Sequence, residues 1–252
     1  SAFATGMAPG STGVFDTLVR PSAGEFRLEP IDSGRFRERA LWDMLGGRGL
    51  KMGVVNYPML YPAYEINGFM VSGMGASKFG DITHPKELRQ ELDREVGVYE
   101  ITTKYKRDKY IGNIELFFTD CGRMLEKRIK AVDYLLDKYP VDVLTTVFSA
   151  SDLMQHYIWS SVDPEHAGFD AQREKTARPL FEKLWGMMDA AIGRWTEQAG
   201  PDATVWIVSD HGFGPLYRNF NVVSWLRKKG YLEIKKGAEK EASKKPWWWS
   251  DR

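Results

Sequence analysis

The sequence predicts an α/β protein with a mainly parallel central sheet, helices on both of its faces and a small inserted cap. Two apolar, β-branched runs, "VDVLTTVFSASD" (141–152) and "ATVWIVSD" (203–210), are typical of strands that are buried on both faces. One long helical pattern precedes the first run, and another lies between the two. Strands that alternate with helices are joined by right-handed crossovers, which make the sheet parallel.

The first part of the chain, residues 1–75, is predicted to be the N-terminal part of the α/β core. Its opening stretch is rich in Gly, Pro, Ser and Thr, which is typical of loops with short extended pieces. Gly46 stops a short helical pattern, and Pro58 ends a short apolar run. In chain order we expect loop (1–30), a short helix (40–49), a buried strand (51–58) and a second short strand (69–72).

The charged stretch 76–112 is predicted to be an inserted cap or lid with a helix near 86–95. Residues 113–234 are predicted to be the remainder of the core. The expected elements there are a long amphipathic helix (114–140), a buried strand (141–152), a long helix (173–199), a buried strand (203–210) and a helix closed by Gly230 (221–232). The last residues, 235–252, have no hydrophobic periodicity, and we expect a flexible or insertion segment.

Composition excludes several kinds of protein. The 252 residues carry 35 basic and 34 acidic side chains, so no broad charge favours nucleic acid or anionic membranes. Glutamates interrupt the lysine-rich stretch 227–245, which is typical of a solvated surface. No apolar run approaches the roughly 20 residues of a membrane span. A single cysteine, Cys121, allows no disulfide within the chain; this is typical of a reducing compartment, and we expect a cytoplasmic protein.

Four side chains suited to metal binding fall at the ends of the two buried runs. Asp152 ends the first run, and His156 follows one helical turn later; Asp210 and His211 end the second. The carboxyl ends of parallel strands meet at one edge of a sheet, where ligands bind. Carboxylate oxygens and imidazole nitrogens are common ligands of Zn²⁺, Mn²⁺ and Fe²⁺, so we predict a metal site at this edge.

Each pair also has an ordinary structural explanation. An aspartate can cap a helix, a histidine can donate to a carbonyl group, and Asp-x-x-x-His can be a plain (i, i+4) pair. The occurrence of both pairs at strand ends favours the metal interpretation. The other histidines, His84 before Pro85 and His166 in a polar loop, are expected to be solvated.

The chain resembles the alkaline phosphatase superfamily, and within it the type I phosphodiesterase/nucleotide pyrophosphatase branch, with its predicted phosphohydrolases and phosphomutases. Four stretches, in this order, carry the resemblance: "AFATGMAPGSTGVFD" (2–16), "LWDMLGGRGLKMGVVNYPMLYPAYEINGFMVSGM" (41–74), "SDLMQHYIW" (151–159) and "IVSDHGFGP" (207–215). The resemblance implies that Asp152 and His156 bind one metal ion, and that Asp210 and His211 bind a second.

The resemblance also implies a phosphate pocket near the start of the chain. Thr5 and Gly6, with Pro9, Gly10 and Gly13, correspond to the family stretch that shapes this pocket. Asn56 and Tyr61 correspond to a strand that approaches the site, so Thr5, Gly6 and Asn56 are candidate substrate-binding residues. The aromatic residues Tyr61, Tyr64, Trp159 and Phe213 either line an apolar wall for the leaving group or pack in the core.

Three expected parts of the family pattern are absent from the sequence. The Ser or Thr nucleophile should precede Ser1, an aspartate should lie further upstream, and a late histidine should follow His211. We therefore expect a fragment of a longer enzyme that is by itself inactive or nearly so. The alternative is a degenerate member that serves as a non-catalytic binding or scaffold protein.

The function that the resemblance implies is metal-dependent hydrolysis of a phosphate ester: a phosphodiester, a nucleotide pyrophosphate or a monoester. The expected cofactors are two divalent metal ions, zinc in the first place and manganese as the alternative. The expected partner is a small-molecule phosphate ester or nucleotide, with no nucleic acid and no membrane span. Phosphomutase or phosphotransferase chemistry is the catalytic alternative, and the oligomeric state stays open.

Overall fold

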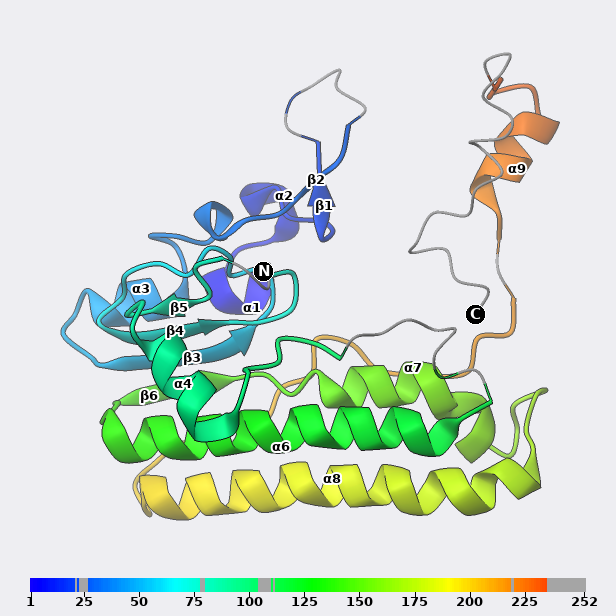
Figure 1. Cartoon of the computed structure of the whole chain (residues 1–252). Coiled ribbons are helices and arrows are strands. Elements are labelled where there is room, and N and C mark those ends of the chain that lie inside the picture. Colours follow the sequence, from blue (N-terminus) through cyan, green and yellow to red (C-terminus); the bar gives the residue numbers. More distant parts are fainter. Residues whose placement is uncertain are drawn as a thin grey trace.

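A computed structural model describes residues 1–20, 22, 27–77, 80–103, 110, 112–218 and 220–234. Figure 1 shows a small sheet with three helices, α6, α7 and α8, on one side and the N-terminal segments on the other. Among the described residues, none of the helices has the length and apolar character needed to span a bilayer. The combination of a sheet with helices packed on it confirms the predicted α/β architecture.

The main sheet has the strand order β5-β4-β3-β6. The bounds are β3 (Met52–Tyr57), β4 (Gly68–Ser72), β5 (Thr83–His84) and β6 (Val143–Thr146). Strand β3 runs parallel to both β4 and β6, and β5 pairs antiparallel with β4. The sheet is thus mainly parallel, as predicted. A separate antiparallel pair joins β1 (Leu18–Val19) to β2 (Glu29–Pro30).

Both faces of the sheet are covered, which explains why the central strands β3 and β4 are mostly apolar. Alternate residues of β3 belong to different hydrophobic clusters: Met52 and Val54 face the N-terminal segments, and Val55 faces the long helices. In β4, Met70 belongs to the cluster on the side of the N-terminal segments, and Phe69 belongs to the cluster on the side of the long helices. Side chains in a strand point alternately to opposite faces, so both sets must be apolar.

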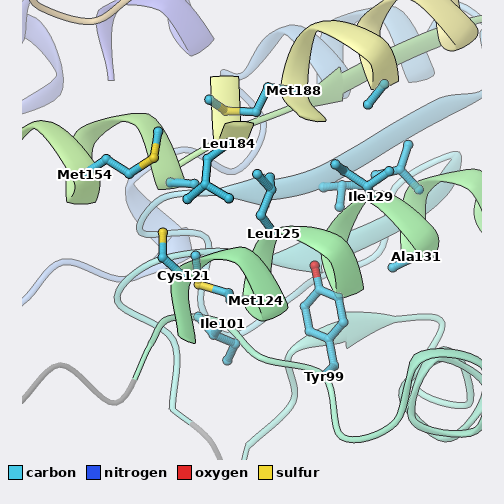
Figure 2. Packing of buried hydrophobic residues seen from close by; sticks show 14 of the residues in the cluster. Tyr99, Ile101, Cys121, Met124, Leu125, Ile129, Ala131, Met154, Leu184 and Met188 are labelled. Carbon is cyan, nitrogen blue, oxygen red and sulfur yellow. The ribbon is translucent and has the colours of Figure 1, made fainter. Parts of the chain in front are cut away.

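The long helices form the layer below the sheet. Their bounds are α6 (Ile114–Lys138), α7 (Ala150–Val162) and α8 (Ala171–Ala199), and the shorter α4 (Leu88–Val96) packs against α6. Helices α4, α6 and α8 confirm the predicted helices, whereas α7 begins inside the strand predicted over 141–152, of which only Val143–Thr146 is strand. Helix α6 starts where the side chain of Asn113 accepts a hydrogen bond from the backbone N–H of Leu116. Figure 2 shows apolar side chains of α6, α7 and α8 packed together. Cys121 lies among them, and burial raises the pKa of its thiol to about 12.

The N-terminal region contains more helix than predicted. Short helices α1 (Ala2–Thr5) and α2 (Pro9–Thr12) lie where we expected loop, followed by a 3₁₀ turn, η1 (Ser33–Arg35), and by the predicted helix α3 (Leu41–Gly46). The reason is local: Gly6 and Gly13 take the left-handed backbone conformation that ends each one-turn helix. The glycines in this stretch correctly indicated turns of the chain, but each turn closes a short helix and does not belong to a loop.

The prediction of a buried strand over 203–210 is wrong. In this part of the chain no strand pairing forms, and the side chains are exposed; Trp206 and Ile207 keep 77% and 78% of their surface. A β-branched run favours a strand, but it becomes one only where a neighbouring strand supplies hydrogen-bond partners. Within the described residues β6 pairs with β3 only. Helix α9 (Val222–Lys228) follows and has no buried side chain.

The segment predicted as a cap contributes two elements to the body of the protein. Strand β5 extends the sheet beside β4, and α4 contacts α6. Residues 78–79, 104–109 and 111 of this segment, and the whole tail 235–252, lie outside the described residues. The division into core, cap and tail stays a prediction.

Candidate functional site

The candidate metal ligands lie at the edge of the sheet where β3 and β6 end. These strands are parallel, so their carboxyl ends meet at the same edge. Helix α7 begins at Ala150, and Asp152 therefore lies in its first turn, not at the tip of the strand as we expected. This position places the Asp152 carboxylate near the positive end of the helix dipole.

Two of the predicted ligands, His156 and His211, converge on the Asp152 carboxylate, and the fourth, Asp210, lies beside His211. The Asp152 Oδ1 atom lies 3.3 Å from His156 Nε2 and 3.7 Å from His211 Nε2. The His211 Nε2 atom also lies 3.7 Å from Asp210 Oδ2. Asp152 and His211, 59 positions apart in the sequence, thus lie side by side, and we call the four residues the Asp/His quartet.

The tautomer of His211 follows from its contact with the backbone. Its Nδ1 atom lies 2.8 Å from the carbonyl oxygen of Gly212, and a carbonyl can only accept, so Nδ1–H donates. The neutral ring then carries its lone pair on Nε2, the atom that faces Asp152 and Asp210. This backbone contact, followed by the Asp210 charge, raises the pKa of His211 above its usual value.

The donor types of the quartet fit a divalent cation. Two ligands at bond lengths of ~2.0–2.1 Å on a tetrahedral ion lie roughly 3.3 Å apart. The separation of Asp152 Oδ1 from His156 Nε2 is 3.3 Å, which matches two ligands of one ion. Among the described residues, however, no group of three or more His, Cys, Asp or Glu side chains is arranged to hold a metal ion. The quartet therefore has the right donors in an open arrangement.

The remaining histidines lie elsewhere. His84 belongs to β5, at the other end of the strand order from β6. His166 accepts a hydrogen bond from the backbone N–H of Gly168, 2.9 Å away, in the turn after α7. Neither histidine contributes to the quartet.

The N-terminal segment reaches the same edge. Ser1 and the hydroxyl of Tyr57 both lie within electrostatic reach of Asp210. The Thr5 hydroxyl donates to the Ser1 carbonyl and accepts from the Met7 N–H, so it shapes the turn that Gly6 completes. Sequence reasoning missed Tyr57, whose only signal is its position near the end of a buried strand.

Asn56 lies at the end of β3, but its side-chain oxygen is engaged. The residue is 4% exposed, and its backbone has a φ of 62°, which non-glycine residues rarely adopt. The Tyr99 hydroxyl donates a hydrogen bond to Asn56 Oδ1. This contact fixes the side chain within the core, and the role of Asn56 in substrate binding stays a prediction.

Two of the four candidate aromatic residues flank the quartet. The ring of Phe213 lies 4.8 Å from that of His156 and 5.4 Å from that of Trp159, measured between centroids. Tyr64 belongs to the other hydrophobic cluster, where its hydroxyl contacts Trp42 and Asp43. Phe213 therefore lies beside the quartet, and Trp159 packs against Phe213.

A mostly parallel sheet flanked by helices, with Asp and His side chains gathered near the carboxyl ends of β3 and β6, is consistent with an α/β protein of the alkaline phosphatase type. The model of the type I phosphodiesterase/nucleotide pyrophosphatase family matches residues 1–246, and the chain belongs to this family. No curated protein and no solved structure matches the chain. The family consists of hydrolases of small-molecule phosphoesters, which are generally metal-dependent.

Proposed function

We propose that the protein hydrolyses a small-molecule phosphate ester with the help of two divalent metal ions held by the Asp/His quartet. The observation that carries the proposal is the convergence of two histidine Nε2 atoms on Asp152 Oδ1, in a chain whose family hydrolyses phosphoesters. Zinc is the first choice and manganese the second, because mixed carboxylate and imidazole shells suit both ions.

In this proposal Asp152 and His156 hold one ion, and Asp210 and His211 hold the other. The bound ions supply positive charge to the attacking and leaving oxygens of the phosphoryl group. The Gly212 carbonyl keeps the proton of neutral His211 on Nδ1, so that Nε2 can bind. Phe213 packs against His156 and restricts the orientation of its ring. The nucleophile is a Ser or Thr that precedes Ser1.

Metal binding tests the quartet directly. We expect the chain to bind Zn²⁺ in isothermal titration calorimetry with a micromolar or weaker dissociation constant, because two protein ligands per ion are few. Asp152→Ala should weaken binding by at least about tenfold, since loss of a direct ligand has a larger effect than loss of an outer contact. His166→Ala is the matched control and should leave the affinity unchanged. Submicromolar binding that survives Asp152→Ala would contradict this assignment.

Turnover separates the proposed hydrolase from its alternatives. A form of the protein that carries the upstream Ser or Thr should release nitrophenol from bis(4-nitrophenyl) phosphate, and Asp210→Asn should abolish this release. Transfer of phosphate between positions of a sugar phosphate would instead indicate a mutase. Metal binding without either reaction would favour the scaffold alternative. A cytoplasmic location stays a prediction.

A further inference from the structure

A second cluster of charged side chains surrounds a cavity on the N-terminal side of the sheet. The cavity has a volume of about 390 Å³, within the range of roughly 300–1,000 Å³ that small-molecule sites occupy. It is lined by Thr12, Gly34, Arg35, Arg37, Glu38 and Arg39. None of these residues belongs to the Asp/His quartet.

The charges around this cavity are unbalanced. The lining residues include three arginines and one carboxylate, Glu38, and so carry a formal charge of 3 − 1 = +2. The Arg37 guanidinium also lies within electrostatic reach of the Asp43 carboxylate, which does not line this cavity. Within the part of the chain that the structure describes, Arg35, Arg37 and Arg39 form no ion pair, and Glu38 forms none either. Each guanidinium offers five N–H donors in a planar fork that matches phosphate oxygens.

The segment that carries the arginines is anchored at both ends. Phe36 and Ala40 are both fully buried, so the backbone on either side of Arg37 is fixed to the core. The Ser33 backbone N–H donates to the Tyr61 carbonyl at 2.9 Å, and the Ser33 hydroxyl donates to the Pro62 carbonyl at 2.6 Å. The guanidinium groups are therefore presented from a fixed base.

A chain of hydrogen bonds holds the far end of the same segment. The Ala40 backbone N–H donates to Asp43 Oδ2 at 3.2 Å, the Tyr64 hydroxyl donates to the same oxygen at 3.1 Å, and Trp42 Nε1 donates to the Tyr64 hydroxyl at 2.7 Å. Arg37 also lies 5.5 Å from the centre of the Tyr64 ring. Burial, the largest influence, raises the pKa of Asp43, whereas these hydrogen bonds favour its ionised form.

We propose that this cavity is an anion-binding site for a ligand with two or more oxyanion groups, such as pyrophosphate. The excess charge selects an anion, and the guanidinium groups of Arg35 and Arg39 favour a ligand whose oxyanion groups can bind both arginines at once. The inference rests on the residues that line this cavity and on the contacts that anchor their segment, and it does not depend on the proposed hydrolase activity.

Calorimetry of the metal-free chain with inorganic pyrophosphate tests the proposal. We expect binding that weakens as salt concentration rises, and that is at least about tenfold tighter than binding of inorganic phosphate. Arg35→Ala combined with Arg39→Ala should weaken binding at least about tenfold, because hydrogen bonds to charged groups are lost. Both arginines are exposed, so circular dichroism should show an unchanged fold.

Arg48→Ala is the matched control, because Arg48 is an exposed arginine of the same region that does not line the cavity. It should leave pyrophosphate binding unchanged. Absence of binding at millimolar pyrophosphate, equal affinity for phosphate and pyrophosphate, or equal losses in the double variant and the Arg48 control would each overturn the proposal.

Discussion

Replacement of Gly73 by alanine is expected to destabilise the protein by about 3 kcal/mol, because the added Cβ has no space. Gly73 follows β4 and is buried against the end of β3. A Cβ at this position would lie 2.0 Å from the carbonyl oxygen of Asn56 and 2.7 Å from that of Tyr57. Both neighbours are backbone atoms, so the clash can be relieved only by separating the strand ends that deliver residues to the site.

Thermal unfolding followed by circular dichroism measures this effect. A loss of about 3 kcal/mol corresponds to a fall in Tm of roughly 6–12 °C for a protein of this size. Gly186→Ala is the control: Gly186 lies on the exposed face of α8 with open space around it, and alanine there should stabilise the helix by up to about 1 kcal/mol. An unchanged Tm for Gly73→Ala would show that the strand ends are not closely packed.

The parts of the fold that sequence predicted well are those in which local pattern and tertiary contacts agree. Helix α6 combines apolar periodicity with a capping Asn113 at its start, and β3 is apolar from Met52 to Val55 because both its faces are covered. The run 203–210 has the same local pattern as β3, but whether it pairs depends on a neighbouring strand. A single sequence does not show that neighbour.

The contacts of the candidate site also differ in how far the sequence could predict them. The meeting of Asp152 with His211 was predicted from two parallel strand ends, but the run 203–210 forms no strand, so the contact arises without the strand pairing that the prediction assumed. The engagement of Asn56 by Tyr99 was not predictable, since these residues come from different segments and only packing brings them together. The arginine cavity was hidden for a related reason: the sequence shows the three arginines, but not that they have no ion-pair partner within the described residues.

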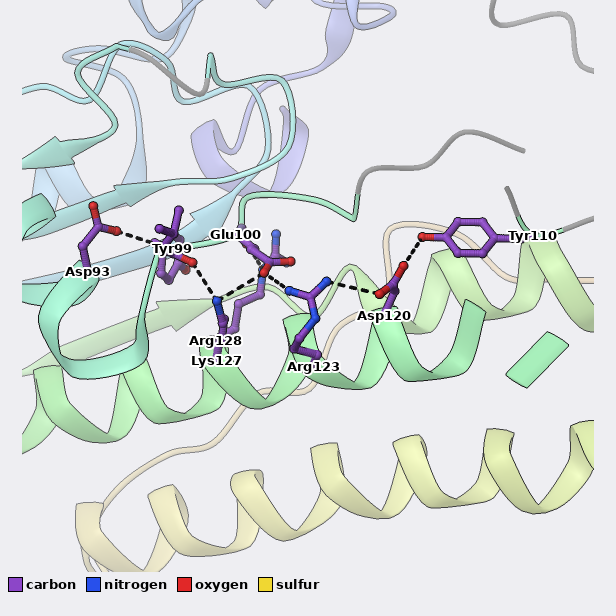
Figure 3. A network of polar contacts seen from close by, with 9 residues as sticks. Asp93, Tyr99, Glu100, Tyr110, Asp120, Arg123, Lys127 and Arg128 are labelled. Carbon is purple, nitrogen blue, oxygen red and sulfur yellow. Dashed lines mark hydrogen bonds and ion pairs between the residues drawn. The ribbon is translucent and has the colours of Figure 1, made fainter. Parts of the chain in front are cut away.

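Arg128 is another residue whose role only the packing reveals. It lies on α6, where an arginine is expected on the surface, but it is only 2% exposed. Its Nε donates to the carbonyl of Glu100 at 3.1 Å, its Nη2 donates to the carbonyl of Ile101, and its Nη1 donates to the Ser149 hydroxyl at 2.7 Å. Figure 3 shows the charged side chains that surround it along α6. Ser149 precedes α7, so Arg128 connects α6 to the helix that carries Asp152.

Replacement of Arg128 by methionine is therefore expected to destabilise the protein by about 3 kcal/mol. The methionine fills much of the space, but it leaves buried acceptors at Glu100 and Ile101 without a donor, and each such acceptor costs ~1–3 kcal/mol. Arg128→Lys should lose nearly as much, because a single ammonium group does not reproduce the three directions of the guanidinium. Urea unfolding measures both variants.

Lys130→Met is the matched control on the same helix. Lys130 is exposed and forms a surface ion pair with Glu126 at 2.9 Å, and such pairs contribute only about 0–1 kcal/mol. A result that contradicts this prediction for Arg128 would also have a clear meaning. Burial opposes its charge and lowers its pKa, so a methionine variant as stable as the parent protein would mean that desolvation cancels the three hydrogen bonds. Arg128 would then position α7 without stabilising the fold, and its removal should weaken zinc binding at the quartet while the Tm stays constant.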